Sequence, residues 1–581
     1  MRLALSFFAA LAAAGPAAAQ PRPNVVVILA DDAGWGDLGV HGNTNLRTPH
    51  LDGLAAAGAR FENFYVQPVC APTRAEFLTG RWHPRGGVRG VSTGAERLNL
   101  DERTIADALR TAGYATGCFG KWHNGSQYPY HPRGRGFDEY YGFPSGHWGD
   151  YFSPPLEHGG RVVTGNGFLP DDLTDRAIGF IERNRSKPFF CYLPLNTPHS
   201  PMQVPDRFYD RFRDAPLALR AAAKEDAAHT RAALAMVENI DWNIGRLLAR
   251  LDALDLAQNT FVVYFHDNGP NGWRWNGGLR GRKGSTDEGG VKSPLLVRWP
   301  GRTRPGTRVA HIAGAVDLFP TIAAMTGAKA TGSKPLDGRN LVPLLTASDV
   351  DWAGRELFSH WAGKTSARSE THRLDDAGRL YDLRTDPGQT KDVSAADPAT
   401  TDRLRAAVAA WRKDVGVPAK ADDRPYPVGH AAFPITHLPA RDGVPHGGVR
   451  RSSAAPNCSF FTNWKTADDR MTWDVEVATA GRYDVQLWYT CPKGSEGSTV
   501  ELSLGAAKLS GKVAEPHDPP LRGAEHDRVK RDAESYVKDF RPLTLGTLEL
   551  PRGRGQLTLR ATAIPGAQVA DVRGITLTLR V

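Results

Sequence analysis

Short, continuous apolar runs dominate the first 345 residues of the chain. Four of them cover residues 25–30, 189–193, 261–265 and 295–299. They are typical of strands buried on both faces, because a half-exposed strand alternates apolar and polar positions instead. Helix-like segments, such as residues 104–113 and 231–255, occur between these runs. The rhythm predicts an α/β domain over residues 20–345, with a mixed, mainly parallel sheet flanked by helices.

The pattern changes after this first part of the chain. Two strand-like pieces precede a helix-like segment at residues 399–415. Helical spacing places Leu404, Val408 and Trp411 on one face of that segment. We expect a small α+β C-terminal subdomain over residues 346–420, with the apolar face of its helix packed against the rest of the chain.

The end of the chain follows a third pattern. After a linker that contains Pro418, Pro425 and Pro427, apolar and polar positions alternate, as at residues 482–489. Alternation is typical of strands with one buried face, so we expect a β-sandwich over residues 421–581. Its strand pattern resembles sugar-binding modules of exported polysaccharide enzymes, and a structural or oligomerising module is an equally open interpretation.

Composition narrows the class of protein. A chain of 581 residues is too long for one ordinary core, and 41% hydrophobic and 23% charged residues are ordinary values for a folded soluble protein. No mature stretch is apolar for the length that a membrane span requires. The formal charge of +9 comes from scattered Lys and Arg residues. We expect no nucleic-acid partner, because an anionic substrate explains this charge at least as well.

The first twenty residues have the three parts of an export signal. Arg2 precedes an apolar run at residues 3–14, and Ala17-Ala18-Ala19 ends the segment. We expect a signal peptide over residues 1–19 and a mature protein that works in the periplasm or outside the cell.

Five cysteines are too few for a disulfide-built scaffold, although export would permit bridges. Cys118 and Cys191 lie in apolar runs, where we expect buried thiols. Cys458 and Cys491 are a possible pair, and Cys70 is the fifth cysteine.

Polar residues follow four strand-like runs at the point where each run ends. These residues are Asp31-Asp32, Lys121-Trp122-His123, Asn196-Thr197-Pro198-His199 and His266-Asp267-Asn268. Because ligands of open α/β sheets gather at the carboxyl ends of the strands, one site can collect all four groups.

Asp31, Asp32, Asp267 and Asn268 are candidate metal ligands. Adjacent carboxylates repel each other unless a positive charge lies between them, and hard oxygen ligands suit Ca²⁺ or Mg²⁺. An Asp-Asp pair alone is more often a turn or a helix cap. Repetition of the pattern at a second strand end favours the metal site.

The segment from Cys70 to Arg81 resembles the recognition motif of type I, formylglycine-dependent sulfatases of the alkaline-phosphatase-like superfamily. Its parts are Cys70-Ala71-Pro72-Thr73-Arg74 and Leu78-Thr79-Gly80-Arg81. In that family a formylglycine-generating enzyme oxidises the cysteine to an aldehyde. The resemblance covers residues 24–415. Further matching segments are Gly120-Lys121-Trp122-His123, Pro198-His199-Ser200-Pro201, Lys283-Gly284 and Glu288-Gly289-Gly290.

The resemblance implies a hydrolase that releases sulfate from a sulfated small molecule or a glycan, and we favour the glycan. One Ca²⁺ per active site is implied, bound by the four oxygen ligands named above and by Cys70 once it is formylglycine. Arg74 and Lys121 are implied to hold this nucleophile and to stabilise its charge, a task that suits a permanently charged arginine.

The resemblance also implies the remaining catalytic roles. Formylglycine 70, hydrated to a diol, attacks sulfur after it loses a proton to Asp267. His199, with Lys283, assists the departing alcohol. His123 then removes the proton of the second hydroxyl group, so that sulfate leaves and the aldehyde returns.

Two other functions stay open. A phosphonate or phosphate ester hydrolase of the same superfamily uses the same aldehyde and metal. A non-catalytic sulfated-glycan-binding protein keeps the basic pocket and has lost the conversion of Cys70.

Several residues near these motifs have two interpretations. His266 stands where the family often has Ser or Thr, and Asp287 where it often has an aromatic residue, so either can alter the substrate pocket or affect Asp267. Residues 273–276 and the pair His147-Trp148 can line the entrance for a sugar ring or pack within their own loops.

Overall fold

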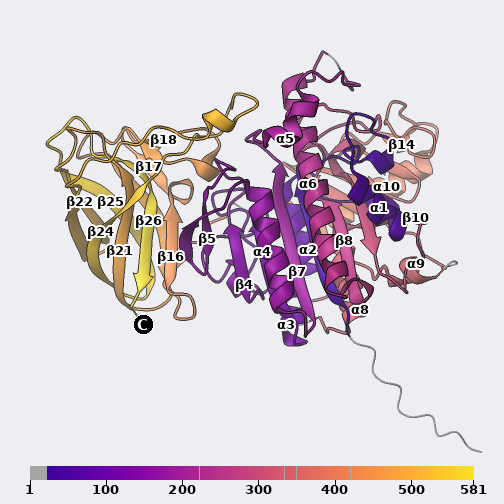
Figure 1. The fold of residues 1–581 in the computed structure, drawn as a ribbon, viewed down its shortest axis with the longest axis horizontal. Coiled ribbons are helices and arrows are strands. Elements are labelled where there is room, and N and C mark those ends of the chain that lie inside the picture. Colours follow the sequence, from indigo (N-terminus) through magenta and orange to yellow (C-terminus); the bar gives the residue numbers. More distant parts are fainter. Residues whose placement is uncertain are drawn as a thin grey trace, which may run out of the picture.

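The computed structural model describes residues 22–221, 223–330, 332, 334–347, 350–418 and 422–580. The expected signal peptide, residues 1–19, lies outside the described residues. Figure 1 shows two bodies side by side. The larger body is built on a central sheet with helices, and the smaller body consists of strands from the end of the chain.

The central sheet of the larger body has ten strands. In spatial order they are β10 (Thr307–Gly314), β2 (Ala59–Tyr65), β9 (Lys292–Arg298), β8 (Thr260–His266), β1 (Asn24–Asp31), β7 (Phe189–Pro198), β3 (Ala115–Lys121), β4 (Glu139–Phe143), β5 (Pro155–His158) and β6 (Arg161–Thr164).

The centre of this sheet is parallel. The strands β8, β1, β7, β3 and β4 run in the same direction, whereas β9 is antiparallel to both of its neighbours and β5 and β6 form an antiparallel edge. Every residue of β1, β7 and β8 is buried, as the continuous apolar runs predict. The prediction of a mixed, mainly parallel sheet is therefore confirmed.

Helices cover both faces of the sheet (Figure 1). One face carries α4 (Leu169–Arg183) and α6 (Ala227–Ala253), and the other carries α2 (Cys70–Thr79), α3 (Ile105–Thr111) and α8 (Leu318–Thr326). Successive residues of β1 alternate between the two cores, because side chains of a strand point to opposite faces. Further helices of the larger body are α1 (Pro49–Ala57), α5 (Asp206–Tyr209), α7 (Glu288–Val291) and α9 (Val342–Thr346).

A four-stranded antiparallel sheet and one helix follow the central sheet. The helix α10 (Pro398–Asp414) buries Leu404 and Trp411 and half-buries Val408, so the predicted apolar face is confirmed. The strands are β11 (Leu357–Trp361), β12 (Lys364–Arg368), β13 (His372–Leu374) and β14 (Leu380–Asp382).

The smaller body is a β-sandwich of two six-stranded sheets around one core that contains Trp464 and Trp473. This confirms the expected strand-rich end of the chain. One sheet contains β15 (Tyr426–Val428), β20 (Arg470–Val477), β25 (Gly553–Ala563), β22 (Thr499–Leu504), β23 (Ala507–Lys512) and β17 (Val444–His446). The other contains β18 (Arg450–Arg451), β19 (Phe461–Thr462), β26 (Asp571–Leu579), β21 (Gly481–Thr490), β24 (Arg541–Leu550) and β16 (Ile435–Pro439).

The β-sandwich contacts the larger body through hydrogen bonds as well as packing. Gln203 Nε2 donates to Asp527 Oδ1 at 2.8 Å, and the Arg528 amide donates to the Met202 carbonyl at 2.8 Å. Gln127 Nε2 donates to Asp442 Oδ2 at 2.9 Å. The loops of the sandwich therefore lie against the segment that directly follows β7.

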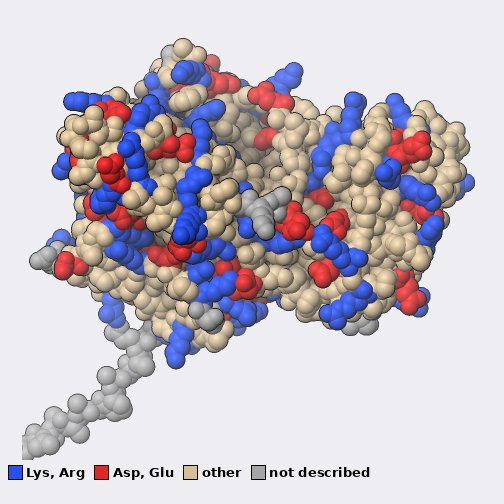
Figure 2. Space-filling view, turned by 180° about the vertical axis from the view of Figure 1, so that it is seen from behind, with Lys and Arg blue, Asp and Glu red and all other residues tan. Residues whose placement is uncertain are grey.

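The surface of the molecule carries both positive and negative side chains. Figure 2 shows basic and acidic side chains interspersed over one face of both bodies. Within the described ranges, no helix has both the length and the apolar character that a bilayer crossing needs. Cys118 and Cys191 are fully buried, as expected, and Cys458 and Cys491 are free thiols rather than a disulfide pair.

Gly120 allows β3 to approach β7 closely. Its φ is +140°, and a Cβ atom at this position would lie 2.0 Å from the carbonyl oxygen of Pro194. We expect Gly120→Ala to lower the free energy of unfolding by about 1–3 kcal/mol, because the β7 backbone has to move. Unfolding in urea, followed by tryptophan fluorescence, measures this change.

Gly53→Ala is the matched control for this substitution. Gly53 lies in α1, and no atom is within 4 Å of the added Cβ. Alanine at such a helical position stabilises by about 0.4–1 kcal/mol, because it restricts the unfolded chain. Equal urea midpoints for Gly120→Ala and the unsubstituted protein would contradict the close approach.

Candidate active site

The predicted site residues meet at the carboxyl ends of four neighbouring parallel strands. The strands lie in the order β8, β1, β7, β3, and the register pairs Ala30 with His266 and Asp31 with Pro198. Each strand therefore ends at the same edge of the sheet as its neighbours. Asp31, Asp267, His199 and Lys121 reach this edge from four different strands, as the pattern of strand ends predicts.

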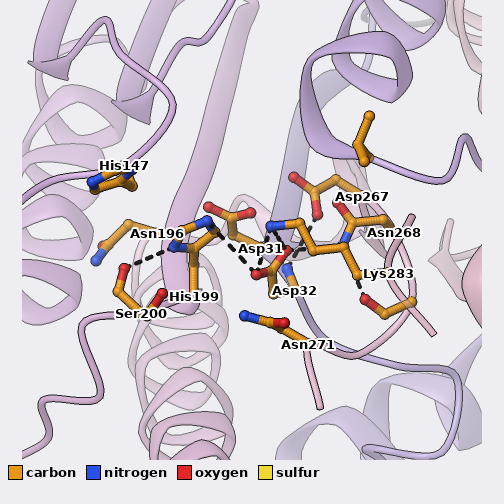
Figure 3. Close-up of polar contacts among 12 residues, drawn as sticks. Asp31, Asp32, His147, Asn196, His199, Ser200, Asp267, Asn268, Asn271 and Lys283 are labelled. Atoms are coloured by element: carbon orange, nitrogen blue, oxygen red, sulfur yellow. Dashed lines mark hydrogen bonds and ion pairs between the residues drawn. The ribbon is translucent and has the colours of Figure 1, made fainter. Parts of the chain in front are cut away.

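Three carboxylates and two lysines form the centre of the site (Figure 3). Lys121 Nζ donates to Asp31 Oδ2 at 2.5 Å, and Lys283 Nζ lies 2.7 Å from Asp32 Oδ1 and 2.8 Å from Asp32 Oδ2. The backbone amide of Asp32 donates to Asp267 Oδ1 at 3.2 Å. Asp31, Asp32, Asp267 and Lys121 are fully buried, so these ion pairs are largely shielded from water.

Arg74 connects the first turns of α2 to the sheet edge. Its Nε and Nη2 atoms donate to Asp267 Oδ2 at 3.1 and 2.8 Å, and its Nη1 atom donates to the Lys121 carbonyl at 2.7 Å. Cys70 is the first residue of the same helix and is 4% exposed. The helix N-terminus, with its partial positive charge, therefore points its first side chain toward the carboxylates.

Burial and ion pairing shift the pKa values of the site in opposite directions. Burial favours the neutral form of Asp32, but the charges of Lys283, His199 and Lys121 outweigh it and hold the pKa of Asp32 well below its usual range. Burial and repulsion from Asp31 raise the pKa of Asp267 to about 6, although Arg74 opposes this shift. The surroundings therefore favour the ionised form of Asp32 more strongly than the ionised form of Asp267.

Three histidines surround the centre. His199 Nε2 lies 3.7 Å from Asp32 Oδ2, and its ring stacks on His147 with 5.7 Å between the centroids. Burial, followed by the charge of Lys283, lowers the pKa of His199 to about 4. His123 Nε2 contacts the Val91 carbonyl at 2.8 Å, whereas its Nδ1 atom has no hydrogen-bond partner among the described residues.

Two site residues have a strained backbone. Asp32 and His123 adopt left-handed φ angles of 65° and 66°. Non-glycine residues reach this region at an energetic cost, and such residues cluster at functional sites.

The oxygen atoms of the site fit a divalent cation. Within the described residues, Asp31 Oδ1 and Asn268 Oδ1 are buried acceptors without a hydrogen-bond donor. Ligand atoms of Asp31, Cys70 and Asp267 lie within 4.8 Å of one another. Carboxylate and amide oxygens are the ligands that Ca²⁺ and Mg²⁺ prefer. Such an ion would satisfy the two acceptors that the protein itself leaves open.

The structure shows the contacts of three residues that the sequence left with two interpretations, Arg274, His266 and Asp287. Arg274 is buried, and its guanidinium pairs with Asp37 at 2.7 Å, so it supports the loop and does not line an entrance. His266 contacts Tyr264 and the Gly34 carbonyl, and Asp287 pairs with Arg280 at 2.7 Å. Neither His266 nor Asp287 has a hydrogen bond to Asp267 among the described residues.

The fold brings two further polar groups to the site: Asn196, from one of the predicted strand ends, and Glu534, which the sequence motifs missed. Asn196 lies beside His199 in Figure 3, and within the described part of the chain neither polar atom of its side chain has a partner. The Ser200 hydroxyl donates to Glu534, which comes from the β-sandwich. Unpartnered buried polar atoms signal Asn196 in a structure, but no local sequence pattern connects residue 534 with residue 200.

Comparison with known proteins agrees with this geometry. A family model described as Sulfatase matches residues 23–328. The chain is 33% identical over 444 residues to steryl-sulfatase of Mus musculus, which covers 60% of this chain and 68% of that protein. It is 34% identical over 374 residues to N-acetylgalactosamine-6-sulfatase of Homo sapiens, which covers 57% of this chain and 67% of that protein.

Solved structures give the same result. The crystal structure of Ps i-CgsB in complex with k-i-k-neocarrahexaose superimposes with a TM-score of 0.61 at 31% sequence identity. The match covers 68% of this chain and 93% of that chain. The matched family region, residues 23–328, contains all the residues that form the carboxylate and lysine centre described above. The chain therefore belongs to the sulfatase family.

Proposed function

We propose that this sulfatase hydrolyses sulfate esters of a glycan, with formylglycine made from Cys70 as the nucleophile and Ca²⁺ as the metal. One observation carries the proposal: the Cys70 sulfur lies within 4.8 Å of carboxylate oxygens of Asp31 and Asp267. Beside them, Asp31 Oδ1 and Asn268 Oδ1 are buried acceptors that have no donor among the described residues. The Ca²⁺ ligands that we propose are Asp31, Asp32, Asp267, Asn268 and residue 70.

Charge in the site supports an anionic substrate. Asp31, Asp32 and Asp267 face three basic side chains, namely Arg74, Lys121 and Lys283. A divalent ion added to this balanced set makes the site positive. A positive, water-poor site stabilises the negative charge that develops on a sulfate ester during cleavage.

Metal and aldehyde supply the reactive chemistry: when present, the divalent ion polarises oxygen atoms, and a hydrated aldehyde at position 70 offers an attacking hydroxyl group. The chain's own residues position these groups. Arg74 fixes the Asp267 carboxylate through two hydrogen bonds, and Asp267 is proposed to accept the proton of the attacking hydroxyl group. Lys121 holds Asp31 in place.

His199 is proposed to protonate the departing alcohol. In the absence of substrate, burial and Lys283 lower its pKa to about 4, so its ring is neutral at pH 7. A bound sulfate ester places a negative charge beside Lys283 and His199, which raises the pKa of the histidine. His199 is then protonated when the leaving oxygen needs a proton. His123, with its open Nδ1 atom, is proposed to remove the last proton of the cycle.

The glycan assignment draws on relatives and on the β-sandwich. The Homo sapiens relative is named for N-acetylgalactosamine 6-sulfate chemistry, and the similar solved structure was obtained with neocarrahexaose. Both names refer to sugars. The loops of the β-sandwich contact the segment next to His199, so a second body borders the site and offers surface for further units of a glycan.

Maturation and location are part of the same proposal. An export signal at residues 1–19 would direct the chain to the periplasm or the outside of the cell. A formylglycine-generating enzyme would act on Cys70 before the chain folds, because Cys70 and the whole of α2 are buried afterwards.

Cys70→Ala is expected to abolish turnover of a chromogenic sulfate ester and to leave the fold intact, because the change removes the precursor of the nucleophile. Turnover and circular dichroism measure the two effects. Mass spectrometry of the peptide that contains residue 70 shows whether the thiol of the active protein has become an aldehyde.

Cys191→Ala is the matched control, because Cys191 is a buried thiol in β7 that faces the apolar core. We expect it to retain turnover. Full activity of Cys70→Ala, or an active wild-type sample whose residue 70 is unmodified cysteine, would exclude the proposed nucleophile.

Calcium affinity is expected to fall as the pH drops below about 6. Asp267, whose folded-state pKa is about 6, binds a proton below that pH, and the proton competes with the cation. Isothermal titration should show Ca²⁺ binding roughly tenfold or more weaker at pH 5 than at pH 7.

Asp267→Asn is the control for this pH dependence. We expect weaker Ca²⁺ binding at both pH values, reduced turnover, and little difference in affinity between pH 5 and pH 7. An unchanged pH dependence in Asp267→Asn would show that another group titrates, and unchanged calcium-dependent turnover would refute the assignment of Asp267.

A further inference from the structure

A cavity lies at the seam between the larger body and the β-sandwich. Its volume is about 160 Å³. The larger body contributes Phe143, Trp148 and Val162 to its wall, and the sandwich contributes Trp488, Phe540 and Arg573. Val162 is 37% exposed, so the cavity reaches solvent at the β6 edge. None of these six residues belongs to the carboxylate centre.

Size limits what this cavity can hold. An engineered cavity of about 150 Å³ in another protein binds benzene, so a space of this volume accommodates one six-membered ring. Aromatic side chains form much of the wall. Trp148 stacks on Phe143 with 5.3 Å between ring centroids, and Trp488 Nε1 donates to Thr576 Oγ1 at 2.9 Å. These contacts hold the two indoles in fixed orientations, and both present apolar surface to the cavity.

Arg573 is the unusual charge in this cavity. The other four charged residues of the lining have ion-pair or hydrogen-bond partners nearby: Arg441 with Glu96, Lys538 with Asp571, Glu157 with His131 and Asp150 with Arg522. Arg573 is half-buried, and among the described residues its guanidinium has neither a carboxylate nor a hydrogen-bond acceptor. The guanidinium carbon lies over the Trp148 ring, 5.6 Å from its centroid.

A guanidinium that is partly shielded from water and has no anionic partner is stabilised when an anion binds beside it. Burial also lowers the pKa of Arg573, because no nearby carboxylate offsets the loss of water around its charge. A sulfate or carboxylate group accepts hydrogen bonds from guanidinium in a bidentate geometry. The cavity thus combines aromatic walls for a ring with one cation for an acidic substituent.

The cavity adjoins the catalytic centre through one loop. His147 stacks on His199 on the catalytic side, and the next residue, Trp148, lines the cavity. Two residues that line the cavity from the sandwich also touch His147: Asn457 Nδ2 lies 3.3 Å from its Nδ1 atom, and Cys458 Sγ donates to its carbonyl at 3.2 Å. The segment His147-Trp148 therefore borders the catalytic centre through one residue and the cavity through the next.

We propose that this cavity binds one sugar ring that carries a sulfate or carboxylate group, with Arg573 pairing with the acidic group and the tryptophans contacting the ring. The ring is either a unit of the glycan substrate next to the one that is cleaved or a free acidic sugar. Binding of a substrate unit rests on the proposed function, whereas binding of a free acidic sugar does not depend on it.

Glucuronic acid is the probe for direct binding, and glucose is the neutral comparison. We expect glucuronic acid to change the fluorescence of Trp148 and Trp488 in the otherwise unsubstituted protein, and glucose to bind more weakly. Arg573→Met keeps the stem of the side chain and removes its charge, so it should weaken glucuronic acid binding roughly tenfold or more. Arg573→Lys should restore part of the affinity, because it retains the charge.

Arg552→Met is the matched control in the same body. Arg552 is exposed in the turn after β24, and the register places it at the opposite end of the strands from Asp571. It should bind glucuronic acid as the unsubstituted protein does. Equal affinity for glucose and glucuronic acid, or unchanged binding in an Arg573→Met protein with a normal unfolding midpoint, would overturn the proposal.

Kinetics distinguish the two sources of the ring. If the ring is a substrate unit, Arg573→Met raises KM for a sulfated oligosaccharide several-fold more than KM for a chromogenic aryl sulfate. If the ring is a free acidic sugar, Arg573→Met loses glucuronic acid binding and changes both KM values alike. Glucuronic acid binding without any turnover of sulfate esters would refute the proposed function and leave this cavity assignment in place.

Discussion

The site depends on the balance of charge around three buried carboxylates. Asp31, Asp32 and Asp267 are fully buried at one sheet edge, where like charges at close range are expensive. Arg74, Lys121 and Lys283 compensate them at distances between 2.5 and 2.8 Å. The compensation is uneven, since Asp32 has a depressed pKa whereas that of Asp267 is raised to about 6. The same edge of the sheet therefore stabilises the ionised form of one carboxylate and disfavours that of another.

The parallel sheet is what makes this concentration of charge possible. Each strand brings one or two polar residues to the same edge, and the buried apolar strands behind them exclude water. The helix α2, which covers one face of the sheet, adds residue 70 and Arg74 to the site. The rigid elements hold the groups in place without a ligand, which lowers the cost of organising them during a reaction.

The β-sandwich is more than an attachment at the end of the chain. Glu534, Asn457 and Cys458 contact the residues that flank the histidine pair. The seam encloses the cavity with the uncompensated Arg573. Through these contacts the sandwich borders His147 and Ser200, the neighbours of His199. The surroundings of His199 therefore depend on both bodies.

Local sequence determined much of this protein. Continuous apolar runs predicted the parallel strands, alternation predicted the sandwich, and polar residues after each run marked the edge at which the site forms. These signals are local because strand burial and strand ends are properties of neighbouring residues. Tertiary structure alone decided the pairing of Glu534 with Ser200, the open polar atoms of Asn196 and the isolation of Arg573. These features depend on contacts between segments hundreds of residues apart, for which a single sequence carries no periodic signal.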